Sequence, residues 1–183
     1  MKKHTLAFID VETTGTDPLK HEIIEIAGIL ARQIPQPDRG PKLEVIEEFE
    51  YKIKPEKLEV AEPQALRING YNDAEWLFAP SLKEVMSALS PKLKDTVMVG
   101  QNVIFDWSFV NESFKRVDLP NPMHYHRIDT MPIFFAKTYH DPRVEWYNLA
   151  AICEYFGIKN EKAHTALADI RVTFEIYKKL LNV

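Results

Sequence analysis

Asp10 and Glu12 are the first residues of this sequence whose types and spacing suggest chemistry. They lie in the segment FIDVETTG (8–15), directly after an apolar run. Side chains two positions apart on a strand project from the same face, so the two carboxylates are expected to lie side by side. Adjacent carboxylates repel each other unless a proton or cation lies between them, and Mg²⁺ and Mn²⁺ favour such oxygen ligands. The pair therefore predicts a divalent metal site, although the same tripeptide is also common on solvated strand ends.

Asp106 follows a second apolar run in a similar way. In GQNVIFDWSFV (100–110), a short apolar strand leads into Gly100, then into a turn with Asn102 and the start of a helix. This arrangement again directs a carboxylate from the end of a core strand, where open α/β sheets bind their ligands. An aspartate in the first turn of a helix also interacts favourably with the helix dipole. The segment alone therefore does not separate a site from an ordinary helix start.

Asp169 lies in a third segment, HTALADI (164–170), at the border of the apolar stripe of the last expected helix. Small residues flank it and leave room for a ligand or a backbone to approach. His164 lies five positions earlier, and residues five apart on a helix point about 140° away from each other. If both serve one site, His164 must therefore lie before the helix or in the loop that leads into it. The alternative is that both are capping and surface residues.

Strand patterns dominate the N-terminal part of the chain. The segments TLAFIDV (5–11) and EIIEIAGILA (22–31) are almost continuously apolar, as buried strands are. EEFEYKIKP (47–55) alternates apolar and charged residues, which is the pattern of a half-buried strand. Proline and glycine in PQPDRGP (35–41) predict a surface loop. TVMVG (96–100) predicts a fourth strand, and the first three strands suggest an antiparallel meander.

Helical periodicity marks most of the remaining sequence. Ser81 and Glu84 have the spacing of a capping box, and Gly157 is placed to end a later helix. Helices are expected over 81–89, 104–117, 129–139, 146–157 and 166–181. These elements predict a mixed sheet with helices packed on it.

The composition fits a single domain of 183 residues, with 45% apolar residues to form a core. A formal net charge of −4 is not that of a protein that coats duplex nucleic acid, but it does not exclude an enzyme that grips a few nucleotides. No apolar run approaches the roughly 20 residues of a membrane helix, and the basic start lacks the features of a signal peptide. Cys153 is the only cysteine, so no intramolecular disulfide is possible, and we expect a cytoplasmic location.

Taken in order, the three acidic segments resemble the three exonuclease motifs of the DEDD superfamily. FIDVETTG resembles the first motif, VGQNVIFDWSFV (99–110) the second and HTALADI the third. His164, with four residues between it and Asp169, resembles the histidine of the DEDDh branch, and Thr165 stands where the sister branch has a tyrosine. The likeness extends over essentially the whole chain, including EIIEIAGI (22–29), RIDT (127–130) and NLAAICEYFGI (148–158).

The resemblance implies an RNase H-like α/β fold, a mixed five-stranded sheet flanked by helices, in a single exonuclease domain over residues 1–183. It implies a 3′–5′ exonuclease that hydrolyses single-stranded nucleic acid to nucleoside 5′-monophosphates with two Mg²⁺ or Mn²⁺ ions. Four acids would hold the ions: Asp10 bridging both, Glu12 and Asp169 on the side of the attacking water, and Asp106 at the second ion. His164 would act as the general base.

The resemblance also suggests where the terminal nucleotide binds. Five residues are expected to contact it: Thr13, Thr14, Gly15, Asn102 and Phe105. The backbone of the first three would hold the terminal sugar, and the phenylalanine would stack on a base. One position near this site departs from the family. After ALRI the family often has His-Gly, whereas this chain has Asn69-Gly70.

The segment ETTG in the first motif resembles proofreading-type members more than oligoribonucleases, which favours DNA over RNA. Two alternatives remain: an exoribonuclease that trims RNA, and a non-catalytic module that docks on a DNA polymerase. No motif acid or histidine is lost, and the chain ends at Val183 directly after the last helix, which favours a free-standing enzyme. The expected partners are single-stranded 3′ ends and, for a proofreading role, a DNA polymerase.

The other histidines have no metal-ligand spacing relative to these acids: His4, His21, His124, His126 and His140. The pair in HYH (124–126) has the residue type of a metal ligand, but a role in a loop is favoured.

Overall fold

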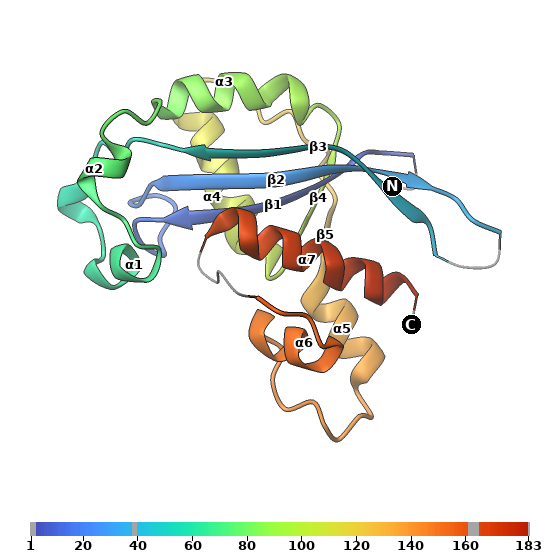
Figure 1. Ribbon diagram of the computed structural model, residues 1–183. Helices are drawn as coiled ribbons and strands as arrows, with labels where there is room; N and C mark the ends of the chain where they lie inside the picture. The colour runs from blue at the N-terminus through green and yellow to red at the C-terminus, as the bar shows by residue number, and fades with distance from the viewer. Residues whose placement is uncertain (1–2, 38–39, 161–164, 183) are drawn as a thin grey trace.

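The computed structural model of the protein describes residues 3–37, 40–160 and 165–182. Its centre is a mixed five-stranded sheet with the strand order β3-β2-β1-β4-β5 (Figure 1). The strands are β1 (Leu6–Thr13), β2 (Ile23–Ile34), β3 (Lys42–Lys52), β4 (Val97–Gly100) and β5 (Arg127–Asp129). β1, β2 and β3 pair antiparallel, whereas β4 runs parallel to β1 and β5 runs parallel to β4. The predicted α/β fold is confirmed.

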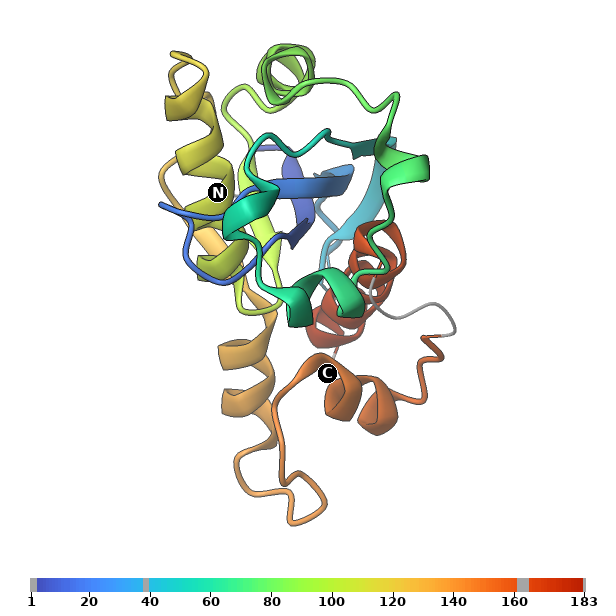
Figure 2. The same ribbon diagram turned by 90° about the vertical axis from the view of Figure 1, so that its left-hand side faces the viewer.

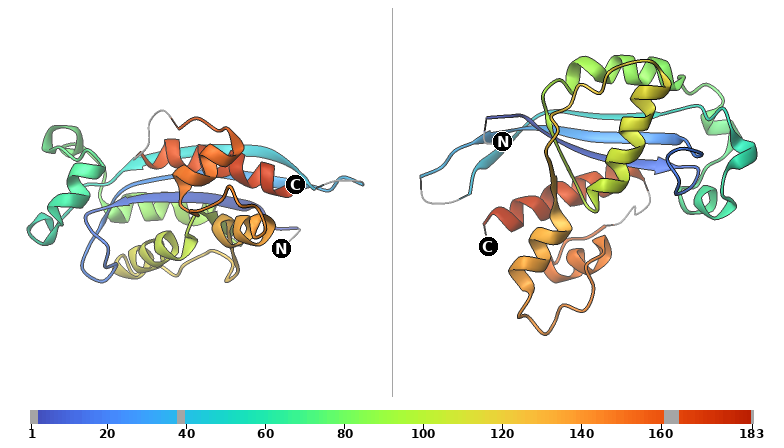
Figure 3. Two further views of the ribbon diagram at one scale, coloured as in Figure 1. Left: turned by 90° about the horizontal axis from the view of Figure 1, so that it is seen from below. Right: turned by 180° about the vertical axis from the view of Figure 1, so that it is seen from behind.

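The central strand β1 is buried on both faces because its apolar side chains alternate between two cores. Ala7 and Ile9 lie in a core with α3 (Leu82–Lys92) and α4 (Val103–Arg116). Leu6 and Phe8 lie in a second core with α7 (Ala166–Leu181). The helices consequently cover opposite faces of the sheet, with α7 on one side and α3 and α4 on the other (Figure 3).

Two further helices extend the structure beyond the sheet. α5 (Thr130–Thr138) and α6 (Leu149–Phe156) pack against α7 and form a third apolar core (Figure 2). This core includes Phe134, Ile152 and Cys153, so the cysteine is a buried core residue. α7 therefore has one apolar side on the sheet and another on these helices, which fixes where its first turn lies.

The connection between β3 and α3 folds over the end of β1 (Figure 1). It contains the 3₁₀ helix η1 (Leu58–Val60), α1 (Pro63–Ile68) and α2 (Asp73–Trp76). The backbone N–H of Glu62 donates to the carbonyl of Thr14 at 2.7 Å, and the indole N–H of Trp76 donates to the carbonyl of Ile24 at 2.8 Å. These bonds hold the connection against the strand end that carries the carboxylates.

The predicted elements are present with shifted ends. α7 has the bounds expected from its apolar stripe, Gly157 ends α6 in the left-handed conformation with φ 66°, and Ser81 and Glu84 form the predicted capping box. β2 and β3 extend further towards the 35–41 loop than expected, to Ile34 and from Lys42, and each of the last three pairs contains at least one polar residue. The short elements η1, α1, α2 and β5 were not predicted. Within the described ranges, no helix is long and apolar enough to cross a membrane.

Candidate active site

Three carboxylates from opposite ends of the sequence meet at the end of β1. Asp10 and Glu12 lie on β1, and Asp169 lies in the first turn of α7. One oxygen from each of the three lies within 4.8 Å of the others. Since α7 packs along β1 and β2, its first turn brings Asp169 to the strand end where the other two acids project.

Asp106 joins this cluster through the backbone of β1. It lies in the first turn of α4 and is 4% exposed, and its Oδ1 accepts a hydrogen bond from the N–H of Val11 at 3.1 Å. β4 pairs with β1 only as far as Phe8, so α4 occupies the edge of β1 beyond that point. The bond to Val11, between the two acids of β1, fixes the Asp106 carboxylate beside them.

The electrostatics of the cluster are those of a site that accepts positive charge. Burial raises the pKa of Asp10 well above its ordinary value, and repulsion from neighbouring carboxylates, first Asp106 and then Glu12, raises it further. The pKa of Glu12 rises to about 7 through burial and through repulsion from Asp169 and Glu25. The pKa of Asp106 rises to about 8, mainly through burial. Such a cluster is favourable only when protons or cations bind between the carboxylates.

The donor set fits a divalent cation. Every ligand atom is a carboxylate oxygen, the type that hard cations prefer, and the oxygens of Asp10, Glu12 and Asp169 are close enough to share an ion. Asp106 is held beside them by the hydrogen bond from Val11 to its Oδ1. The four acids predicted from the sequence are therefore brought together at one site.

His164, the fifth expected residue, lies outside the described residues. Asn160 and Thr165 are the described residues on either side of positions 161–164, and they lie beside Asp169 and at the start of α7, respectively. Asn160 donates through Nδ2 to Asp169 Oδ1 at 2.7 Å, and the side chain of Thr165 caps α7 by accepting from the N–H of Ala168 at 3.4 Å. Because α7 begins at Ala166, His164 precedes the helix in the chain, as the spacing argument requires.

The turn after β1 is closed by its own side chains. Thr14 is fully buried, and its hydroxyl accepts a hydrogen bond from the N–H of Glu22 at 2.9 Å. The hydroxyl of Thr13 donates to the carbonyl of Gly15 at 2.7 Å. A Cβ at Gly15 would lie 2.4 Å from the ring of His21, so this position needs a glycine. The side chains expected to contact substrate thus stabilise the turn, and its backbone remains the part suited to binding.

Asn102 and Phe105 lie at the start of α4. Asn102 is exposed and has a left-handed backbone with φ 58°, which asparagine tolerates better than most residues. Phe105 is half-buried, with its ring centroid 5.0 Å from that of Phe109. Both belong to the turn and helix that position Asp106, and their contact with substrate stays a prediction.

Glu25 is a site residue that the sequence reasoning did not single out. It lies opposite Glu12 in the pairing of β1 with β2, it is 5% exposed, and its Oε1 accepts from the N–H of Ala166 at 2.9 Å. Glu25 therefore anchors the first turn of α7, three residues before Asp169. An acid within the apolar run EIIEIAGI (22–29) is the sequence feature that could have identified it, because charged residues are rarely buried without a partner.

Asp129 positions the start of α4 in a comparable way. Its Oδ1 accepts from the N–H groups of Asn102 and Met131, both at 3.0 Å, and its Oδ2 accepts from the N–H of Val103 at 3.1 Å. The Asp-Thr turn noted in the sequence therefore joins the end of β5 to the starts of both α4 and α5. The Asp129 carboxylate thereby holds the start of α4, the helix that carries Asp106.

Asn69, at the position where the family often has a histidine, holds the connection to the strand end. Its Nδ2 donates to the carbonyl of Thr13 at 3.0 Å, and its Oδ1 accepts from the N–H of Tyr71 at 3.2 Å. Asn69 therefore lies beside the acidic cluster's strand end and fixes the backbone of the turn that follows β1.

Two substitutions of Glu25 should distinguish the effect of its charge on activity from the effect of its hydrogen bond to the first turn of α7. Glu25→Ala removes the acceptor for the α7 N–H group and should lower kcat by about 10- to 10²-fold, because small displacements of catalytic groups have effects of that size. Glu25→Gln keeps an acceptor and should retain most activity. Glu50→Gln, an exposed acid on β3, is the matched control. Equal losses in the alanine and glutamine variants would show that the charge of Glu25 matters and not its anchoring bond.

Comparisons with known proteins agree with this arrangement. The family model described as RNase_T exonuclease matches residues 7–177. The chain is 28% identical over 176 residues, 94% of its length, to a PolC-type DNA polymerase III of Streptococcus pneumoniae, and the match covers 11% of that protein. This chain thus spans about a tenth of the length of that curated relative.

Solved structures of exonuclease I have the same fold. One matches with a TM-score of 0.78 and 22% identity, over 97% of this chain and 40% of that chain. A complex of Escherichia coli exonuclease I with a dA16 oligonucleotide matches with a TM-score of 0.76 and 22% identity, over the same shares of the two chains. The matched family model runs from β1 to α7 and so includes every strand and helix that carries the four acids. The chain belongs to the RNase_T exonuclease family.

Proposed function

We propose that the protein is a metal-dependent 3′–5′ exonuclease that hydrolyses single-stranded DNA to nucleoside 5′-monophosphates. The observation that carries this proposal is the convergence of Asp10, Glu12 and Asp169, with oxygens within 4.8 Å of one another, beside the buried Asp106. Carboxylates this close together and partly or fully withdrawn from water are costly for a fold unless they bind protons or cations. The membership of the exonuclease family supports the same reaction class.

We assign the four acids to two Mg²⁺ or Mn²⁺ ions. Asp10 would contribute to holding both ions, with Glu12 and Asp169 on the side of the attacking water and Asp106 on the side of the leaving group. The ions would supply an activated water and neutralise the negative charge that develops on the phosphate.

The remaining steps belong to side chains near the cluster. His164 takes the proton from the attacking water as general base. Asn160 and Thr165 flank the segment that contains it, and Asn160 orients Asp169. The backbone of the 13–15 turn, which its buried threonines hold rigid, contacts the terminal sugar, and the exposed side of Phe105 stacks on a base.

The preference for DNA is supported by the relatives and by the first motif. The PolC-type relative is a DNA polymerase, and a structural neighbour of the same fold is described in complex with dA16. By this analogy the natural substrate is a DNA 3′ end, and a DNA polymerase is a candidate partner.

Mononucleotide release should be measured on DNA and RNA oligomers of matched sequence, with Mg²⁺ and with Mn²⁺. Faster release from RNA would favour the exoribonuclease alternative, and no release from either would favour a docking module.

The polarity of digestion provides a separate prediction. A site that binds a terminal sugar places the last phosphodiester at the acids, so a 3′-phosphate should displace the reacting bond and slow digestion by more than about tenfold. A 5′-phosphate on the same oligomer is the control and should have no effect. Gel analysis of labelled oligomers measures both. Efficient cleavage of a circular single strand would contradict this polarity and identify an endonuclease.

A further inference from the structure

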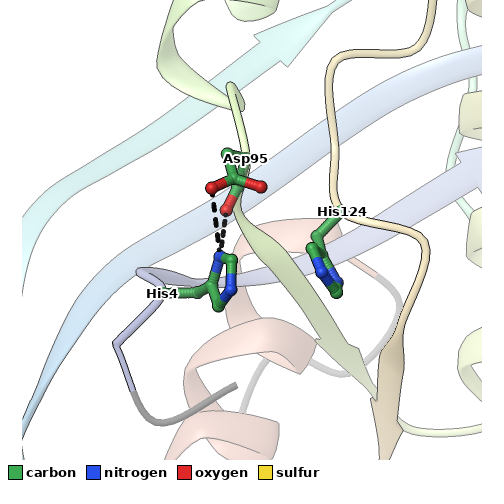
Figure 4. A group of neighbouring side chains, drawn as sticks. All are labelled: His4, Asp95 and His124. Atoms are coloured by element: carbon green, nitrogen blue, oxygen red, sulfur yellow. Dashed lines mark hydrogen bonds and ion pairs between the residues drawn. The ribbon is translucent and has the colours of Figure 1, made fainter.

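A second cluster of metal-ligating side chains lies at the opposite end of β1 from the acids. It consists of His4, Asp95 and His124, which precede β1, β4 and β5 (Figure 4). One nitrogen from each imidazole and one carboxylate oxygen lie within 4.8 Å of one another. Nothing in the proposed exonuclease reaction uses these residues.

The backbone holds the three segments together. Three hydrogen bonds join them: Val97 N to Thr5 O at 3.0 Å, His124 N to Thr96 O at 2.9 Å, and Asp95 N to Pro122 O at 2.9 Å. Because each bond lies within one residue or two of a candidate ligand, the fold itself brings these side chains to one place. A pre-assembled site loses less conformational entropy when a ligand binds.

The spacing of His4 and Asp95 suits a shared ion. His4 Nδ1 lies 3.3 Å from Asp95 Oδ2 and 2.9 Å from the Asp95 carbonyl oxygen. Ligands about 2.1 Å from a tetrahedral zinc ion lie about 3.4 Å from each other. The first distance therefore already matches one edge of such a site. The carboxylate of Asp95 is 69% exposed, so an ion has access to it from solvent.

The imidazoles of this cluster lie close together. The ring centroids of His4 and His124 are 4.5 Å apart, and those of His124 and His126 are 5.0 Å apart. Zinc binds the neutral form of imidazole, and His4 and His124 each offer one ring nitrogen at this place.

We propose that His4, Asp95 and His124 bind one Zn²⁺ ion at a site separate from the acidic cluster. Two imidazoles and one carboxylate form a mixed nitrogen and oxygen set, which zinc accepts and which differs from the all-oxygen set at the other end of β1. Water completes the fourth position. The ion links the segments before β1, β4 and β5 and so stabilises the parallel part of the sheet.

Calorimetric titration tests the site directly. Chelator-treated protein without a polyhistidine tag is titrated with Zn²⁺ in an Asp10→Asn background, which weakens competing binding at the acidic cluster. We expect one zinc site that His124→Ala weakens by at least about tenfold. His140→Ala, an exposed histidine at the end of α5, is the matched control and should leave it unchanged. An unchanged affinity in His124→Ala, or no zinc site in the Asp10→Asn protein, would overturn the proposal.

Thermal unfolding gives a second readout that does not depend on activity. Excess Zn²⁺ should raise the melting temperature of the Asp10→Asn protein by about 5 °C, since an ion that binds only the folded state stabilises it. Adding Asp95→Asn to this protein should abolish the rise, and asparagine tolerates the positive φ of 56° at this position. Asp95→Asn alone should keep the Mg²⁺-dependent activity of the wild type. An equal rise in both proteins would show that zinc acts elsewhere and would refute the assignment.

Discussion

Replacement of Asp10 by asparagine should lower the rate of mononucleotide release by at least about 10³-fold while the protein remains folded. Loss of one group that stabilises charge in a transition state costs about 10²–10³-fold, and Asp10 would contribute to holding both proposed ions. The side chain keeps its size, so packing around β1 is unchanged. Asp73→Asn, at an exposed position at the start of α2, is the control and should retain full activity.

The same variant should be more stable than the wild type when metals are removed. The raised pKa values mean that the folded protein binds more protons than the unfolded chain between about pH 4 and 8, so repulsion lowers the stability of the wild type as pH rises through that window. Asp10→Asn removes part of this repulsion. Its melting temperature in EDTA should exceed that of the wild type, and by more at pH 8 than at pH 5. Near-normal turnover in a folded variant would exclude Asp10 from the site.

His164→Ala should lower the rate by about 10²–10⁴-fold, which is the usual contribution of a positioned general base. A general base must be neutral to accept a proton, and a free histidine titrates near pH 6.5. The wild-type rate should therefore rise with pH through an ionisation in the neutral range, and the residual rate of the variant should lack it. The measurement is the pH–rate profile of both proteins at saturating metal.

Binding of Mn²⁺ separates a base from a ligand. If His164 acts as the base, calorimetry should find Mn²⁺ affinity largely unchanged in His164→Ala. His140→Ala is the matched control for both measurements. A variant with the wild-type rate and profile would mean that the base lies elsewhere, and a variant that no longer binds Mn²⁺ would mean that the histidine is a ligand.

The positions of the acids could be predicted because each follows a strong local pattern. Asp10 and Glu12 come after a continuous apolar strand, and the apolar stripe of α7 placed Asp169 in its first turn. Asp106 follows β4 through a short turn, so the parallel pairing of β4 with β1 brings its helix to the same end of the sheet. Local patterns placed these four residues at the ends of strands and the starts of helices, and the resemblance to the three exonuclease motifs assigned them to one site.

The residues that position the acids could not be predicted in the same way. The anchor from Glu25 to Ala166 spans 141 positions, and Asn69 reaches Thr13 across 56, so neither contact leaves a local pattern. β5 is too short to show alternation. The cluster of His4, Asp95 and His124 has no regular spacing at all, because only the alignment of three strand starts brings it together.

The dependence of activity on metal tests the central claim most directly. Wild-type protein freed of metal by EDTA is mixed with a 5′-labelled single-stranded DNA oligomer, and shortening from the 3′ end is followed before and after an excess of Mg²⁺ or Mn²⁺ is added. The account predicts no shortening in EDTA and a stepwise ladder once either metal is present. Undiminished shortening in excess EDTA would contradict the assignment of Asp10, Glu12, Asp106 and Asp169 to catalytic metal ions.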